Sequence, residues 1–183
     1  MGLFPPEIFA NHVARLRAAA HRLEEERQGE HGNELFPTDA VVLLALGVEI
    51  GLKSLICYER GLADVGEIRG LKAGYWNRHD LLLLFQLLCS ETQAALEDRT
   101  LDLLPQEQRF LGAFKFDRPT YPDMSFSIQG GTTFLAWLDS ARFTFEAWRY
   151  HYEEPQLGPL NVSMLYAFAE AVEESLRNPI ARR

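Results

Sequence analysis

Apolar residues recur at helical spacing along most of this chain, and no stretch alternates between apolar and polar positions as a β-strand does. The pattern predicts helices over residues 6–28, 39–60, 78–98, 105–114, 132–154 and 162–178. The stretch 115–131 contains prolines and a Gly-Gly pair, so we expect an irregular surface excursion before the penultimate helix. We therefore predict an all-α fold, a four- to five-helix, up-and-down bundle in a single domain spanning 1–183.

The helix predicted over residues 39–60 is apolar nearly all round, which is typical of the central element of a bundle. Thr38 is expected to be its N-cap and Gly61 its C-cap. Gly47 and Gly51 lie four residues apart on one face, where glycine costs stability unless the missing side chains are used. They indicate either the close approach of another helix, within the bundle or across a dimer, or no packing role at all.

The helix predicted over residues 132–154 carries two stripes of side chains. Apolar residues at spacings of three and four form an inward-facing stripe of Phe134, Leu138, Ala141, Phe145, Trp148 and Tyr152. A charged stripe lies beside it, formed by Arg142, Glu146, Arg149 and Glu153, and it is either a solvated, salt-bridged face or a recognition surface. Some of the surplus aromatic residues are expected to face a partner or a pocket: Trp137, Phe143, Trp148, Tyr150 and Tyr152.

Three further polar residues qualify as candidates for a site. Glu49 and Lys53 form an i, i+4 pair inside the apolar second helix, where charges must be paired or lie at an edge of the core. The pair is either a structural ion pair or part of a polar seam shared with Arg142 or Arg149. With Asn77 as the N-cap of the next helix, His79 falls in its first turn, where it either caps and packs or serves as a base.

Composition narrows the class of protein. The net charge of −8 argues against general coating of nucleic acid, so any contact with RNA or DNA must be local. Cys57 and Cys89 lie in apolar runs without metal-ligand spacing, so we expect reduced, buried thiols, no metal and no cofactor. The sequence contains no secretory signal pattern, and Glu49 and Lys53 interrupt its longest apolar run. We therefore expect a cytoplasmic protein without a membrane span.

Three motifs together resemble the HEPN domain family. The segment "VEIGLKSLICYERG" resembles the Glu-x-x-x-Lys second helix of these domains, "NRHDLLLLFQLL" resembles their His-Asp-Leu helix start, and "WRYHYE" resembles an Arg-Tyr-x-Tyr-Glu segment of several bacterial members. The resemblance covers about residues 39–154 and implies an all-helical bundle, commonly a homodimer, of toxin-antitoxin, phage-defence or RNA-processing systems. Active members are metal-independent ribonucleases that use an arginine and a histidine four to six residues apart.

The sequence departs from that arginine-histidine pattern. Arg149 and His151 are separated by one residue, so on a helix they point in nearly opposite directions. Arg15 and His21 have the required spacing, but they lie in the first helix, where the family motif is not expected.

The sequence therefore supports two interpretations. The first is a non-catalytic or degenerate HEPN-like bundle that dimerises and binds a nucleotide, RNA or a protein partner such as an antitoxin. Its expected binding residues are Arg142, Glu146, Arg149, Tyr150, His151, Glu49 and Lys53. The alternative is an atypical metal-independent ribonuclease that uses His79 and Arg149 from different helices or subunits.

Overall fold

The structure, a computed structural model, describes residues 5–30, 38–71, 79–104, 133–142, 144 and 162–180. Of these residues 84% are helical and none is in a strand, which confirms the predicted all-α fold. The elements are α1 (Pro6–Glu30), α2 (Thr38–Arg60), the 3-10 helix η1 (Val65–Gly70), α3 (Leu81–Leu87), α4 (Ser90–Asp102), α5 (Phe134–Ala141) and α7 (Val162–Arg177).

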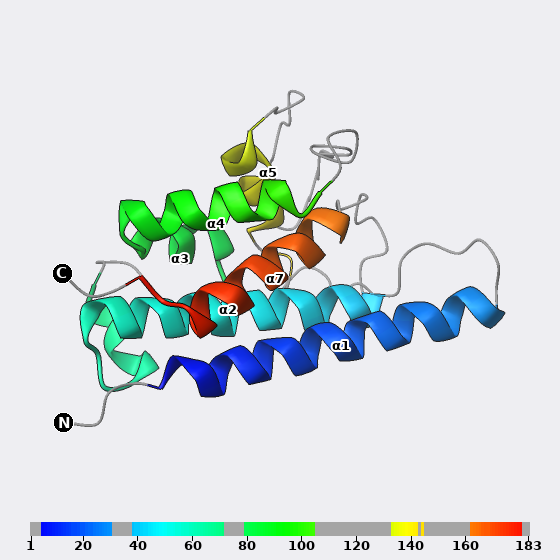
Figure 1. Cartoon of the computed structure of the whole chain (residues 1–183), viewed down its shortest axis with the longest axis horizontal. Coiled ribbons are helices and arrows are strands. Elements are labelled where there is room, and N and C mark those ends of the chain that lie inside the picture. The colour runs from blue at the N-terminus through cyan, green and yellow to red at the C-terminus, as the bar shows by residue number, and fades with distance from the viewer. Residues whose placement is uncertain are drawn as a thin grey trace, which may run out of the picture.

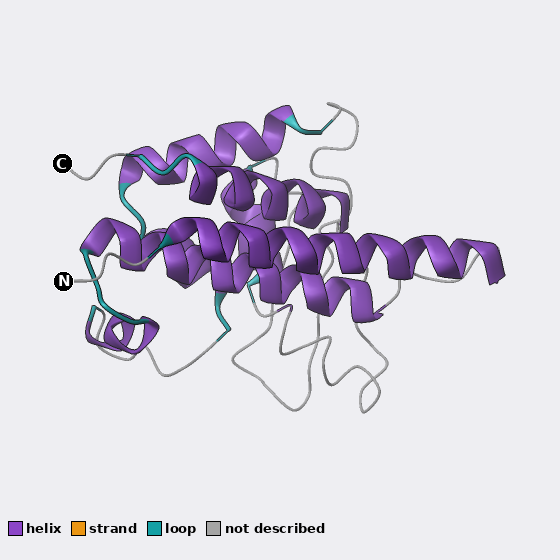
Figure 2. Cartoon of the chain, turned by 60° about the horizontal axis from the view of Figure 1, so that its bottom comes forward, coloured by secondary structure: helices purple, strands orange, loops and turns teal. Residues whose placement is uncertain are grey.

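Helix α2 is the centre of the bundle. It runs antiparallel to α1 along most of its length, and α7 packs against both helices (Figures 1 and 2). Helix α4 covers the other side of α7, while α3 contacts α2 and α5. The predicted apolar character of α2 is confirmed, because its side chains meet neighbours on several sides; Leu44, Val48, Leu52 and Ile56 are fully buried.

The two glycines of α2 allow close helix packing within the chain. A methyl group at Gly51 would overlap the side chain of Val172 in α7, so only glycine fits this crossing. At Gly47 the added carbon would meet Leu16 of α1 at 3.6 Å, which is an ordinary contact. Of the expected roles, close approach inside the bundle is therefore confirmed, and Gly51 is the position that requires it.

Helix α2 ends as the sequence predicts. Gly61 has a φ of 67°, which glycine adopts without strain. Its N–H donates to the carbonyl of Tyr58, and the N–H of Leu62 donates to that of Cys57, so two of the last carbonyls of α2 are satisfied. At the other end the helix begins at Thr38, one residue before the predicted start, and the cap expected at Thr38 stays a prediction.

The single helix predicted over residues 78–98 is wrong, because the chain breaks between α3 and α4. Leu88 and Cys89 are extended, with ψ of 158° and 156°. The N–H of Cys89 donates to the carboxylate of Glu59 in α2 at 2.9 Å, and the Gln93 side chain donates to the carbonyl of Leu88. The long-range bond to Glu59 and the local bond from Gln93 replace helical hydrogen bonds, and apolar periodicity alone does not reveal them.

The helix predicted over residues 132–154 is also wrong in its extent. Its first residue is Phe134, and Thr133 is the N-cap, with a side chain that accepts the N–H of Ala136. It ends at Ala141, and Thr144 belongs to a further helical turn. Trp137 is buried at 3% exposure among the rings of Phe134 and Phe168, so it belongs to the core. The other aromatic residues of which some were expected to face a partner or a pocket lie outside the described residues.

The expectations for the helix over 105–114, the excursion over 115–131 and the aromatic residues after Ala141 lie outside the described residues. As for a membrane span, α2 is long and apolar enough by composition to cross a bilayer in spite of Glu49 and Lys53. Its most apolar window is 72% buried by the other helices, which is what the core helix of a bundle shows.

Candidate functional site

Glu49 organises a cluster of three polar residues on α2 and at the start of α3, which we call the Glu49 cluster. Its carboxylate is 4% exposed and accepts a hydrogen bond from Lys53 Nζ through Oε1 at 2.5 Å. Its other oxygen, Oε2, lies 2.5 Å from His79 Nδ1. Because an ionised carboxylate can only accept, Nδ1 is the protonated nitrogen of this histidine. The predicted Glu49–Lys53 pair is confirmed, and it gains a third member, His79, from the segment just before α3.

Asp80 forms a second group, the Asp80 cluster, with Arg142 and Asp139. The Asp80 carboxylate caps α3 by accepting the N–H of Leu83 at 3.0 Å. Arg142 donates to the same carboxylate through Nε at 3.2 Å and Nη2 at 2.5 Å, and its Nη1 donates to Asp139. Burial lowers the pKa of Arg142, but the hydrogen bonds and charges of Asp80 and Asp139 outweigh it and raise the pKa above its ordinary value.

The Asp80 cap corrects the predicted position of His79. Helix α3 begins at Leu81 with Asp80 as its N-cap, so His79 lies before the helix and not in its first turn. A cap at Asn77 is therefore wrong. The His79–Asp80 dipeptide instead joins the two clusters, because one residue bonds to α2 and the next bonds to Arg142. No hydrogen bond among the described residues links Glu49 or Lys53 to Arg142, so a polar seam shared by these residues stays a prediction.

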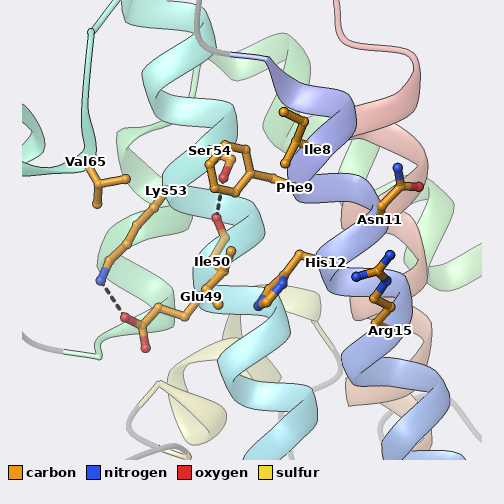
Figure 3. A pocket seen from close by; sticks show the side chains of 10 residues that line it. All are labelled: Ile8, Phe9, Asn11, His12, Arg15, Glu49, Ile50, Lys53, Ser54 and Val65. Atoms are coloured by element: carbon orange, nitrogen blue, oxygen red, sulfur yellow. Dashed lines mark hydrogen bonds and ion pairs between the residues drawn. The ribbon is translucent and has the colours of Figure 1, made fainter.

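A pocket of about 540 Å³ opens between α1 and α2, next to the Glu49 cluster (Figure 3). Helix α1 supplies Ile8, Phe9, Asn11, His12 and Arg15, helix α2 supplies Glu49, Ile50, Lys53 and Ser54, and η1 supplies Val65. In Figure 3, Phe9 and His12 extend from α1 towards α2, and Lys53 extends beside Glu49. Such a volume is in the usual range for small-molecule sites.

The charges that line the pocket are mostly positive. Arg15 and Lys53 are the basic residues of the lining, and Glu49 is the one carboxylate among the described lining residues. Glu49 is already shared by Lys53 and His79. Neither Arg15 nor His12 forms a hydrogen bond or ion pair with another described residue. Their donors can therefore bind an anion without breaking a contact within the described part of the chain.

The structure places the predicted binding residues in different settings. Lys53 and Glu49 line the pocket, whereas Arg142 belongs to the Asp80 cluster. Four others lie outside the described residues: Glu146, Arg149, Tyr150 and His151. The pairing of His79 with Arg149, on which the alternative ribonuclease interpretation depends, therefore stays a prediction.

Sequence interpretation missed His12 and Arg15. The signal for them was present, because Ile8, His12 and Arg15 are spaced by four and three residues and share one face of α1. Ile8 is 63% exposed, which places it on this outer face. Ile8, His12 and Arg15 form one wall of the pocket on α1. The packing of α2 beside α1 supplies the other wall.

In the comparisons with known proteins, no family model matches this chain, and neither a curated protein nor a solved structure matches it. The resemblance to HEPN domains therefore stays a prediction.

Proposed function

We propose that this protein is a non-catalytic helical bundle that binds an anionic ligand, with a nucleotide or the end of an RNA as the ligand that the HEPN resemblance favours. The binding site is the pocket between α1 and α2. The observation that supports it is the placing of Arg15, His12 and Lys53 around one pocket of a protein with a net charge of −8. Because the net negative charge of the protein repels a polyanion, contact with one requires a local group of cations. Arg15 and Lys53 supply such a group here.

The Glu49 cluster supports the binding role by fixing Lys53. A lysine side chain is flexible, and holding its ammonium group against Glu49 reduces the entropy lost when a ligand binds. An ammonium group has three donors, so Lys53 can keep its bond to Glu49 and still donate to a phosphate oxygen. Arg15 offers a planar fork that suits phosphate or carboxylate.

The proposed function changes the role of one predicted binding residue. Arg142 is removed from the binding set, because its guanidinium group is engaged with Asp80 and Asp139 and stabilises the junction of α3 with α5. The homodimer, the antitoxin partner and the cytoplasmic location stay predictions.

The test is a binding titration with adenosine 5′-monophosphate and a short single-stranded RNA, each at low and high salt. Arg15→Ala is the informative variant, because Arg15 is exposed and its loss breaks no contact among the described residues. Arg22→Ala is its control, since Arg22 is an exposed arginine of the same helix outside the pocket. We expect binding that weakens with salt and falls at least about fivefold in Arg15→Ala but not in Arg22→Ala. Equal loss in both variants, or no binding, contradicts the proposal.

One observation favours a second candidate, a metal-independent ribonuclease. Glu49 orients His79 through Nδ1, as a carboxylate orients the histidine of a catalytic triad. The test is cleavage of a labelled RNA pool in EDTA by the wild type, His79→Ala and Arg149→Ala. The binding proposal predicts no cleavage by any of the three proteins. Cleavage that survives EDTA and is lost in His79→Ala would replace it with the ribonuclease.

A further inference from the structure

The pocket between α1 and α2 has an apolar side that an inorganic anion alone would not use. Ile8, Phe9, Ile50 and Val65 line it together with the cations. Ile8 is the most exposed large apolar side chain in the described part of the chain, at 63%, and Val65 is 37% exposed. Scattered apolar residues on a surface are normal, but here two of the exposed ones line the same pocket, one from α1 and one from η1.

The pocket is also larger than an inorganic anion would fill. Its volume of about 540 Å³ would leave most of the space, and the apolar side chains around it, in contact with water if only a phosphate were bound. A ligand that covers Ile8 and Phe9 while its charged group reaches Arg15 would remove that apolar surface from water.

The charges of the pocket residues limit the number of negative charges that the ligand carries. Arg15 and Lys53, less the charge of Glu49, leave one net positive charge, with His12 as a further donor. That suits one carboxylate or one phosphate group. A continuous nucleic-acid strand carries a charge at every nucleotide and is bound by a longer row of cations.

We infer that the pocket between α1 and α2 takes a small amphipathic anion, a single carboxylate or phosphate group on an apolar body, with the anionic group at Arg15 and His12, which lie side by side on α1 (Figure 3), and the body against Ile8 and Phe9. This inference rests on the proposed anion-binding function and narrows its ligand. An RNA would enter this pocket only by its terminal nucleotide.

The experiment compares four probes by calorimetry or ligand-observed NMR: inorganic phosphate, hexyl phosphate, hexanoate and hexanol. Adenosine 5′-monophosphate is added to distinguish an aromatic body from an aliphatic one. We expect hexyl phosphate, hexanoate or the nucleotide to bind at least about tenfold more tightly than inorganic phosphate, because each buried methylene adds a severalfold gain. Hexanol, which has the apolar body without the charge, should bind at least about tenfold more weakly than hexyl phosphate.

Two variants test the apolar side and the charged side of the pocket separately. Ile8→Ser should lower the affinity for hexyl phosphate by about threefold or more, and by a larger factor than it lowers the affinity for inorganic phosphate. Leu135→Ser is its control, since Leu135 is 48% exposed on α5, outside the pocket. Arg15→Ala should weaken both phosphates.

Each contrary outcome has its own meaning. Equal binding of inorganic and hexyl phosphate, with loss of both in Arg15→Ala, would overturn this inference while the anion-binding function stands. Binding of hexanol as tight as that of hexyl phosphate, or binding by no probe, would overturn both.

Discussion

Arg142 and Asp80 lie 62 residues apart in the sequence and are joined by two hydrogen bonds, from Nε to Oδ1 and from Nη2 to Oδ2. The backbone reinforces the contact, because the carbonyl of Arg142 accepts the N–H of Leu81 at 2.9 Å. Together these bonds fix the end of α5 against the start of α3. Asp80 is 5% exposed, so its charge depends on this partner.

We predict that Arg142→Ala lowers the free energy of unfolding by about 2–3 kcal/mol, because it leaves a nearly buried carboxylate without its cation. Anion binding should be unchanged, since Arg142 does not line the pocket. Urea unfolding and a phosphate titration measure the two effects. Arg142→Lys should be intermediate in stability. A variant that is as stable as the wild type but binds the anion poorly would restore Arg142 to the binding set.

The two glycines of α2 give a matched pair of substitutions. Gly51→Ala should destabilise the protein by about 1–3 kcal/mol, because the new methyl overlaps Val172. Gly47→Ala has room at 3.6 Å and should be neutral or stabilising by up to about 1 kcal/mol, since alanine favours the helix. Thermal and urea unfolding of both variants measure the difference.

A double variant tests the cause of the Gly51 effect. Gly51→Ala with Val172→Ala should be more stable than the sum of the two single losses, because the smaller side chain makes room for the methyl. Strict additivity would show that the overlap with Val172 is not the reason.

Glu49→Gln should strengthen anion binding about fivefold at low salt, because the removal of a negative charge outweighs the loss of the contact that positions Lys53. The substitution removes the one carboxylate among the described pocket residues and frees Lys53 from its ion pair. It should also cost about 1–2 kcal/mol of stability, because Lys53 and His79 lose their charged acceptor. Titration with hexyl phosphate alongside urea unfolding tests both effects. Weaker anion binding by a folded Glu49→Gln protein would show that Glu49 positions the ligand through Lys53 more than it competes with it.

Cys57 should give the protein a stability that falls at alkaline pH. Burial first, and then the charges of Asp64 and Glu67, raise the pKa of this thiol from 9.0 to about 11. Between these values the unfolded thiol ionises while the folded one stays protonated, so stability is lost as the pH rises from 9.0 towards 11. Urea unfolding from about pH 8 to 10.5 should show a smaller loss in Cys57→Ala than in the wild type. The same slope in both proteins would contradict the raised pKa.

Features that depend on contacts along a single helix were predicted correctly from the sequence. Spacing of three and four residues placed α1 and α2, and the i, i+4 rule found the pair of Glu49 with Lys53. Gly61 ended α2 as its backbone freedom indicates. In each case the partners lie close together along the chain, so local chemistry decides the outcome.

Features that the sequence did not predict depend on residues brought together by folding. The break at Cys89 follows from a hydrogen bond to Glu59, thirty residues earlier, and Arg142 is held by Asp80. Trp137 is buried against Phe168 of α7, a contact that helical spacing within α5 does not reveal. The pocket arises where the outer face of α1 meets that of α2, so neither His12 nor Arg15 could be assigned to it from helical spacing alone.

The most direct test of the central claim is a ¹H–¹⁵N NMR titration of the full chain with hexyl phosphate, in the wild type and in Arg15→Ala. The account predicts saturable shifts of amides along the facing parts of α1 and α2, including those of Arg15 and Lys53, and their loss in the variant. Shifts that are absent, that centre on the Asp80 cluster, or that persist in Arg15→Ala would contradict the claim that this pocket binds an anion.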